Sequence, residues 1–352
     1  MKHFKFYSKE DILSLTRIHR YETKTGERLQ YIKPGQEWPE VMEESSAKYV
    51  LLGIPEDFGV KGNHGIGGAD TAWLSFLHAF LNTQSNDFMS GENILLLGHF
   101  DFGDIKFLVE NNAYNDEEKI NAYQHALNIV DEEVEDIVKV IAAAKKIPII
   151  IGGGHNNAYP IIKAMAKGLH KADMVPLSQI NCINLDAHSG YAVANGRHNG
   201  NAFRYAEEDG YLGKYCLVGL HENYIAQSIL MDMHSNPFVD YISYEDIFLH
   251  ERKNFIQAVA HATGFTEDSY TGIEIDLSCI EDTLSNKLTP SGISTLHARK
   301  FVTFAAQDAK VAYLHISEGA TQLADGRKND ATGKLISYLV SDFIKELSQE
   351  QR

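Results

Sequence analysis

Three short segments of the chain carry side chains of the types that bind metal ions in proteins. Each segment follows or ends an apolar run. The first holds His155 after three glycines, and the second holds Asp186 and His188, two residues apart. The third holds Glu274 and Asp276 at the same spacing. Side chains two apart on a strand point to the same face, so each pair can reach one point in space. Converging imidazole nitrogens and carboxylate oxygens suit a divalent metal such as Mn or Zn.

Each segment also has an explanation that involves no metal. The glycines before His155 permit a tight turn, beside which a histidine can be incidental. Acidic residues inside an apolar strand are costly unless they are paired or metal-bound, so Glu274 and Asp276 could equally form salt bridges. Taken together, two imidazoles and three carboxylates at neighbouring strand ends favour the metal interpretation.

The elements that must position these residues alternate along the chain, with short apolar runs between longer amphipathic segments. Runs that are apolar on both faces are typical of a parallel sheet covered by helices on each side. In such α/β folds functional residues cluster just past the carboxyl ends of the strands. The predicted strands are residues 49–53, 94–98, 147–152, 180–185, 215–219, 272–276 and 309–315, and the predicted helices are residues 117–146, 158–170, 290–308 and 334–349.

The chain of 352 residues could form one large α/β domain or two smaller ones. No linker rich in proline, glycine and serine divides it, so we predict a single domain over residues 46–352. Residues 1–45 are predicted to be a polar N-terminal extension.

Composition excludes several classes of function. A net charge of −16 argues against a nucleic-acid partner, because phosphate binding needs concentrated lysine and arginine. No apolar run is long enough to span a membrane, and the first ten residues lack the apolar core of a signal peptide. Three cysteines are too few for a disulfide framework, so we expect reduced thiols and a cytoplasmic protein.

The order of the motifs resembles the ureohydrolase superfamily of arginase, agmatinase and formimidoylglutamase. The glycine–histidine turn, the Asp186 pair and the acid pair are followed by Thr289-Pro-Ser-Gly292 and then by Glu318. Segments such as Gly53-Ile-Pro-Glu-Asp57 look most like formimidoylglutamase, and the resemblance runs from Gly53 to the C-terminal helical segment. It implies one three-layer α/β/α domain around a mostly parallel, about eight-stranded sheet, and assembly as a homo-oligomer, typically a trimer or hexamer.

The resemblance also implies a reaction and a ligand set. Two Mn(II) ions would hold a bridging hydroxide, and that hydroxide would attack the planar carbon of a small amidine or guanidino substrate, because a metal makes bound water nucleophilic at neutral pH. His155 would bind the first metal, and Asp186 would bridge both. His188 and Asp276 would bind the second, and Glu274 stands where the family has a bridging aspartate.

Further residues are candidates for contact with the substrate or for proton transfer. Glu318 stands where the family places the carboxylate that faces the substrate's cationic group. His198 lies near the position of a proton-shuttling histidine, one place out of register with agmatinases. Arg197 and Arg204 could pair with a substrate carboxylate or form surface salt bridges.

Gly190 departs from the family pattern, which has a metal-binding aspartate at this position. The centre could therefore hold two metals with a substitute ligand, one metal, or none. The sequence predicts a metal-dependent amidine hydrolase similar to formimidoylglutamase. The alternative is a catalytically degenerate protein of this fold that serves as a binding or assembly subunit.

Overall fold

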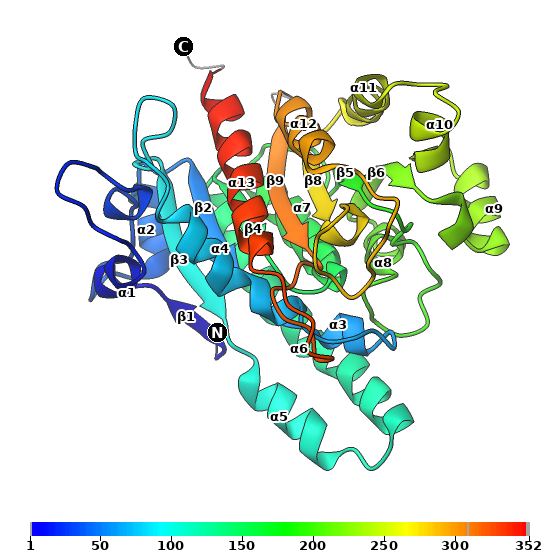
Figure 1. Ribbon diagram of the computed structural model, residues 1–352, viewed down its shortest axis with the longest axis horizontal. Coiled ribbons are helices and arrows are strands. Elements are labelled where there is room, and N and C mark those ends of the chain that lie inside the picture. Colours follow the sequence, from blue (N-terminus) through cyan, green and yellow to red (C-terminus); the bar gives the residue numbers. More distant parts are fainter. Residues whose placement is uncertain (1, 308–309, 350–352) are drawn as a thin grey trace.

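A nine-stranded sheet forms the centre of the part of the chain that the computed structural model describes, residues 2–307 and 310–349 (Figure 1). The strands pair in the order β1-β3-β2-β4-β9-β8-β5-β6-β7, and all neighbouring pairs are parallel except β1 with β3. The strands are β1 Phe4–Phe6, β2 Tyr49–Gly53, β3 Ile94–Phe100, β4 Ile147–Ile151, β5 Ile180–Leu185, β6 Leu212–Leu220, β7 Val239–Ser243, β8 Thr271–Asp276 and β9 Val311–Ser317.

Successive side chains of each central strand enter different cores, which gives the molecule three layers. In β2, Val50 and Leu52 join one buried apolar cluster, and Tyr49 and Leu51 join the other. Because side chains alternate across a strand, both faces of the sheet are apolar and both need covering. Helices α6 Asp116–Ala143, α7 Ala158–Lys171 and α8 Ala202–Glu208 cover one face, and α4 Ala72–Phe80, α11 Phe255–Thr266, α12 Thr295–Ala305 and α13 Ala331–Gln349 cover the other (Figure 1).

Shorter helices complete the connections between these layers. Some begin with a side-chain cap, such as α10, where Ser243 Oγ accepts the backbone N–H of Asp246. The shorter α-helices are α1 Lys9–Ser14, α2 Trp38–Glu44, α3 Phe58–Lys61, α5 Gly103–Asn112, α9 Gln227–Ser235 and α10 Tyr244–Phe248. The 3-10 helices are η1 Thr25–Glu27, η2 Ala69–Thr71, η3 His155–Asn157, η4 Glu222–Tyr224 and η5 Leu277–Cys279.

The observed architecture confirms the predicted three-layer, mostly parallel fold, and β2 and β5 have the predicted bounds. Two strands were not predicted, namely β1 and β7. Both lie at edges of the sheet, and β7 carries half-buried Asp240 and Tyr241, so neither has a continuous apolar pattern. Asp308 and Ala309, at the end of one predicted helix and the start of the last predicted strand, lie outside the described residues.

The segment predicted as an N-terminal extension, residues 1–45, contributes β1 to the sheet edge. Phe4 pairs with Phe100 in an antiparallel register, and their rings meet edge to face at 4.9 Å. Met1 and residues 350–352 lie outside the described part, and the boundary at residue 45 stays a prediction. Among the helices described, none is long and apolar enough to cross a membrane.

Candidate metal centre

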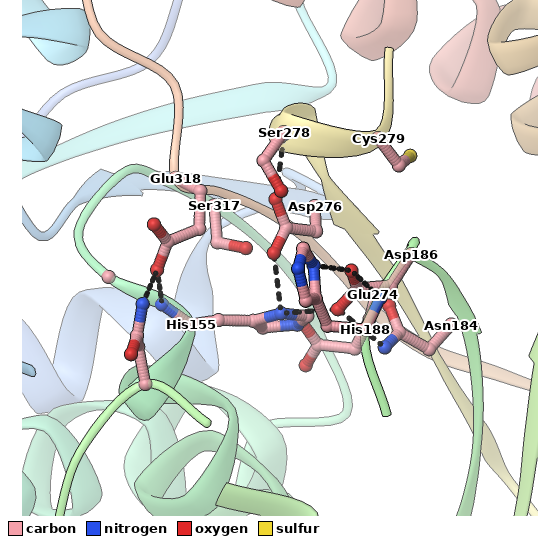
Figure 2. Close-up of polar contacts among 12 residues, drawn as sticks. His155, Asn184, Asp186, His188, Glu274, Asp276, Ser278, Cys279, Ser317 and Glu318 are labelled. Carbon is pink, nitrogen blue, oxygen red and sulfur yellow. Dashed lines mark hydrogen bonds and ion pairs between the residues drawn. The ribbon is translucent and has the colours of Figure 1, made fainter. Parts of the chain in front are cut away.

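Four adjacent strands in the middle of the sheet bring most of the predicted site residues together. His155 begins η3 just after β4, Asp186 follows β5, Asp276 ends β8 and Glu318 follows β9. In the sheet these strands lie in the order β4-β9-β8-β5, so their carboxyl ends form one continuous edge. The side chains of these four residues are buried, and Figure 2 shows His155, Asp186 and Asp276 converging there, with Glu318 beside them.

His155, Asp186 and Asp276 have the spacing of ligands around one cation. His155 Nδ1 lies 3.2 Å from Asp186 Oδ2 and 3.3 Å from Asp276 Oδ2. Two ligands at about 2.0–2.1 Å from a common metal are separated by about 2.9 Å in octahedral and about 3.3 Å in tetrahedral geometry. The donor set of one imidazole and two carboxylates therefore fits a divalent metal, and one ligand atom from each of the three residues lies within 4.8 Å of the other two.

Backbone amides orient both carboxylates toward this point. Asp186 Oδ1 accepts the N–H of His188 at 2.8 Å, and Asp276 Oδ1 accepts the N–H of Ser278 at 2.7 Å (Figure 2). Each bond closes a short turn just past its strand, and it occupies one oxygen of the carboxylate. The other oxygen of each is thereby directed at His155.

His188 lies at the outer side of the cluster. Its ring stacks on Tyr224, with centroids 5.1 Å apart and planes 8° apart, and its Nδ1 lies 3.6 Å from Asp186 Oδ1. That nitrogen is buried and has no hydrogen-bond partner in the structure. The structure thus places His188 beside Asp186, with its Nδ1 at ion-pair distance from that carboxylate but without a hydrogen bond.

Glu274 lies one side-chain layer deeper than Asp276. Its Oε1 accepts the hydroxyl of Tyr313 at 2.7 Å, and its Oε2 lies 2.6 Å from His315 Nδ1. The same Oε2 is 3.3 Å from His155 Nε2. Burial raises the pKa of Glu274, but the charge of His315 and the contact with His155 outweigh burial and lower it to about 2. Glu274 is therefore a charged carboxylate held from three sides.

The sequence analysis missed His315 and Glu56. His315 is fully buried, and its strand register places it opposite Glu274. Buried Glu56 accepts Gly154 N–H at 3.0 Å and Asn157 Nδ2 at 2.6 Å, and so fixes the glycine turn before His155. An unexplained histidine in an apolar strand was the only sequence signal for His315.

Glu318 is adjacent to the cluster and firmly held. It has a left-handed backbone conformation, φ 63°, and its Oε1 accepts His155 N–H at 2.8 Å and Asn199 Nδ2 at 2.9 Å (Figure 2). Burial, followed by the charge of Asp276, raises its pKa. Strained backbone conformations of this kind cluster at functional sites.

His198 makes no described contact with the carboxylate cluster. Its Nδ1 accepts the N–H of Gly200 at 3.0 Å, within its own loop, and burial lowers its pKa to about 4. Arg197 pairs with buried Asp131 at 2.9 Å, and Arg204 with Asp232. Both arginines thus form salt bridges, but that of Arg197 is buried, whereas the sequence allowed only for a surface one.

Phe203 fills the space beside Gly190. Gly190 has φ 59°, and a Cβ added there would lie 2.6 Å from Phe203 Cδ2. The buried ring stacks on Tyr215 at 4.4 Å and meets the His155 ring edge to face at 5.3 Å. An aromatic ring therefore lies where a side chain at position 190 would begin.

Comparison with known proteins defines the class to which this fold and site belong. A family model described as the arginase family matches residues 47–344, so the chain belongs to the arginase family. No curated protein sequence matches significantly.

The structure is similar to several solved members at low sequence identity. Formimidoylglutamase from Bacillus subtilis has a TM-score of 0.72 and 16% identity, over 95% of this chain and 94% of that chain. Formiminoglutamase from Trypanosoma cruzi with Mn²⁺ has a TM-score of 0.69 and 18% identity, over 93% and 99%. Agmatine ureohydrolase from Thermoplasma volcanium has a TM-score of 0.62 and 17% identity, over 90% and 93%. These likenesses confirm the predicted arginase-like fold.

A substitution at Gly190 tests whether Phe203 closes this part of the centre. We expect Gly190→Asp to lower the free energy of unfolding by about 1–3 kcal/mol through overpacking, in addition to the cost of its left-handed backbone. Gly210→Asp is the matched control, because Gly210 has φ 79° and no heavy atom within 4 Å of an added Cβ. Denaturant titration measures both, and equal stability of the two variants contradicts the steric account.

Metal binding should stabilise the fold. Mn(II) at about 100 times its dissociation constant is expected to raise the free energy of unfolding by about 2.7 kcal/mol. Asp276→Asn should abolish this gain, because the Oδ2 that faces His155 is then replaced or neutralised. The melting temperature of each protein is measured with Mn(II) and after chelation. A wild type that melts at the same temperature in both conditions contradicts the prediction.

Proposed function

We propose that this chain is a metal-dependent hydrolase of linear C–N bonds in small amidine or guanidino compounds, with a formimidoylglutamase-like substrate. The observation that carries the proposal is the spacing of 3.2 and 3.3 Å from His155 Nδ1 to the oxygens of Asp186 and Asp276. A divalent metal bound there would supply a lowered pKa for bound water and polarisation of the substrate. Mn(II) is the proposed metal, since a formiminoglutamase of the same fold was solved with it.

The chain's own residues give this chemistry a defined place. Asp186, Asp276 and His155 would hold the cation, with His188 as the outer ligand whose Nδ1 is not otherwise bonded. Glu318, fixed through its Oε1, is proposed to orient the cationic amidine or guanidinium group of the substrate with its second oxygen, to which Asn286 Nδ2 lies at 3.4 Å. Charge pairing of this kind positions a planar cation for attack. His198, whose pKa lies near 4, stays a candidate proton carrier.

A second candidate function is a degenerate arginase-fold subunit that binds or assembles without catalysis. Phe203 beside Gly190 and the contacts of Glu274 with Tyr313 and His315 favour it, because both occupy positions that the resemblance assigns to metal binding. This candidate predicts no turnover at any metal loading.

Cellular location and assembly are proposed on narrower grounds. Cys182, Cys216 and Cys279 are free and buried, which suits a reducing compartment, and we propose the cytoplasm. We further propose a homo-oligomer, a trimer or hexamer, which light scattering of the purified chain would measure.

Hydrolysis of a substrate panel tests the two functions against each other. The protein loaded with Mn(II) should release ammonia or formamide from N-formimidoyl-glutamate, or urea from arginine or agmatine, at rates that a chelator abolishes. Product analysis by mass spectrometry measures each outcome. Absence of turnover with every substrate, in protein that demonstrably holds metal, excludes the hydrolase and leaves the binding subunit.

Substitution of Glu318 tests its proposed role. Glu318→Gln keeps the shape of the side chain and removes its charge, so kcat/KM should fall by at least about 100-fold, the scale of losing a charged contact of about 3 kcal/mol. Metal content should not change, because Glu318 is not among the proposed ligands. A variant that retains full activity contradicts the assignment.

A further inference from the structure

We propose that each chain binds one metal ion, and that Glu274 is a positioning residue that holds the His155 ring from behind and does not bind a metal. This inference rests on the metal centre of the proposed function. It changes the role of Glu274, one of the two acidic residues that the resemblance places between two ions.

Strand register places Glu274 outside the layer that faces the cation. Glu274 is paired with Asn184 on β5 and His315 on β9, whereas Asp276 is paired with Ser317 one side-chain layer further along β9. Asp186 follows Asn184 by two residues and so shares the layer of Asp276. Same-face neighbours on a strand are about 6.6 Å apart, twice the rise per residue. The two aspartates therefore face one point, and Glu274 lies below it.

The two nitrogens of His155 separate these layers. Nδ1 faces Asp186 and Asp276, and Nε2 is 3.3 Å from Glu274 Oε2. Nε2 is buried and makes no hydrogen bond in the structure, but Glu274 Oε2 lies within ion-pair distance of it. A metal-binding histidine almost always has such an acceptor at its other nitrogen, which fixes the tautomer and the ring orientation. Through this ion pair, Glu274 is proposed to take that part for His155.

Both oxygens of Glu274 are already engaged from the side away from the cation. Tyr313 donates to Oε1 at 2.7 Å, and His315 Nδ1 lies 2.6 Å from Oε2. The ring of Tyr313 reaches this position because it lies over Gly272, where a Cβ would collide with the ring. Rotation of Glu274 toward the two aspartates would break both contacts in a fully buried place, where unpaired polar groups are costly.

His155, Glu274 and His315 form a second group with metal-ligand spacing, but its geometry fits an ion pair better. The 2.6 Å between His315 Nδ1 and Glu274 Oε2 is a hydrogen-bond distance. It is shorter than the separation of about 2.9 Å between neighbouring ligands of one octahedral metal. Glu274 and His315 therefore form a hydrogen-bonded pair that contacts the His155 ring at Nε2, the nitrogen that does not face the two aspartates.

An aromatic ring also lies against His155. Phe203 meets the His155 ring edge to face at 5.3 Å and fills the space next to Gly190. With no carboxylate at position 190 and Glu274 turned to Tyr313 and His315, the oxygens that face His155 Nδ1 are those of Asp186 and Asp276. These suffice for one cation.

Metal content and Mn(II) spectroscopy test the inference on the full-length wild-type protein. Elemental analysis after dialysis against Mn(II) should give one ion per chain, with the electron paramagnetic resonance spectrum of isolated Mn(II). Two ions per chain, or the spectrum of a coupled pair, overturns the inference.

The variant Glu274→Gln tests the positioning role, because an amide can keep both neighbouring contacts while it removes the charge. We expect one ion per chain at saturation and a dissociation constant for Mn(II) raised about 10–100-fold. Glu135→Gln is the matched control, a half-buried carboxylate bound to Lys163 and Lys167 between α6 and α7, and should bind Mn(II) like the wild type. Circular dichroism verifies that both variants fold. Unchanged affinity in Glu274→Gln, or complete loss of binding from the folded variant, overturns the positioning role.

These measurements separate the inference from the proposed function. One ion per chain without turnover supports the inference and contradicts the hydrolase. Two ions per chain with turnover supports the hydrolase and overturns the inference. No bound metal, even with excess Mn(II), overturns both.

Discussion

Burial of several carboxylates in one small region is the constraint on which this structure depends. Asp186, Asp276, Glu274 and Glu318 are all at most 5% exposed, at the carboxyl edge of the sheet. Taking such charges out of water costs several kcal/mol per ion unless positive charge and hydrogen bonds compensate. Backbone amides, the two imidazoles of His155 and His315, and a bound cation are the available compensation. The packing of this region is therefore governed by the need to balance buried negative charge.

Two glycines near the centre each lie against an aromatic ring. Gly190 leaves room for Phe203, and Gly272 leaves room for Tyr313. In the first pair the Phe203 ring fills the space that a side chain at position 190 would need. In the second pair the Tyr313 hydroxyl donates a hydrogen bond to Glu274. Because protein interiors are packed as densely as organic crystals, neither ring could be present without its glycine. Each pair brings an aromatic side chain to the centre: Phe203 contacts the His155 ring, and Tyr313 donates a hydrogen bond to Glu274.

The sheet converts this local chemistry into a fixed geometry. Parallel pairing of β4, β9, β8 and β5 aligns four strand ends, and the cores on both faces hold the strands in register. A shift of one residue would send the site side chains to the opposite face. The match of the arginase-family model to residues 47–344 shows the family to which the chain belongs, whereas the proposed number of metal ions depends on a few side chains at the strand ends.

The sequence by itself determined the fold class, the bounds of β2 and β5, and the kinds of side chain at the three strand ends. Apolar periodicity and short motifs are local signals, so they can be read from neighbouring residues. Only the tertiary structure decided that Glu274 pairs with Tyr313 and His315, which lie 39 and 41 residues away along the chain. It also decided that Phe203 fills the space at Gly190. These contacts depend on strand register and on the direction of side chains across elements, which no local pattern encodes.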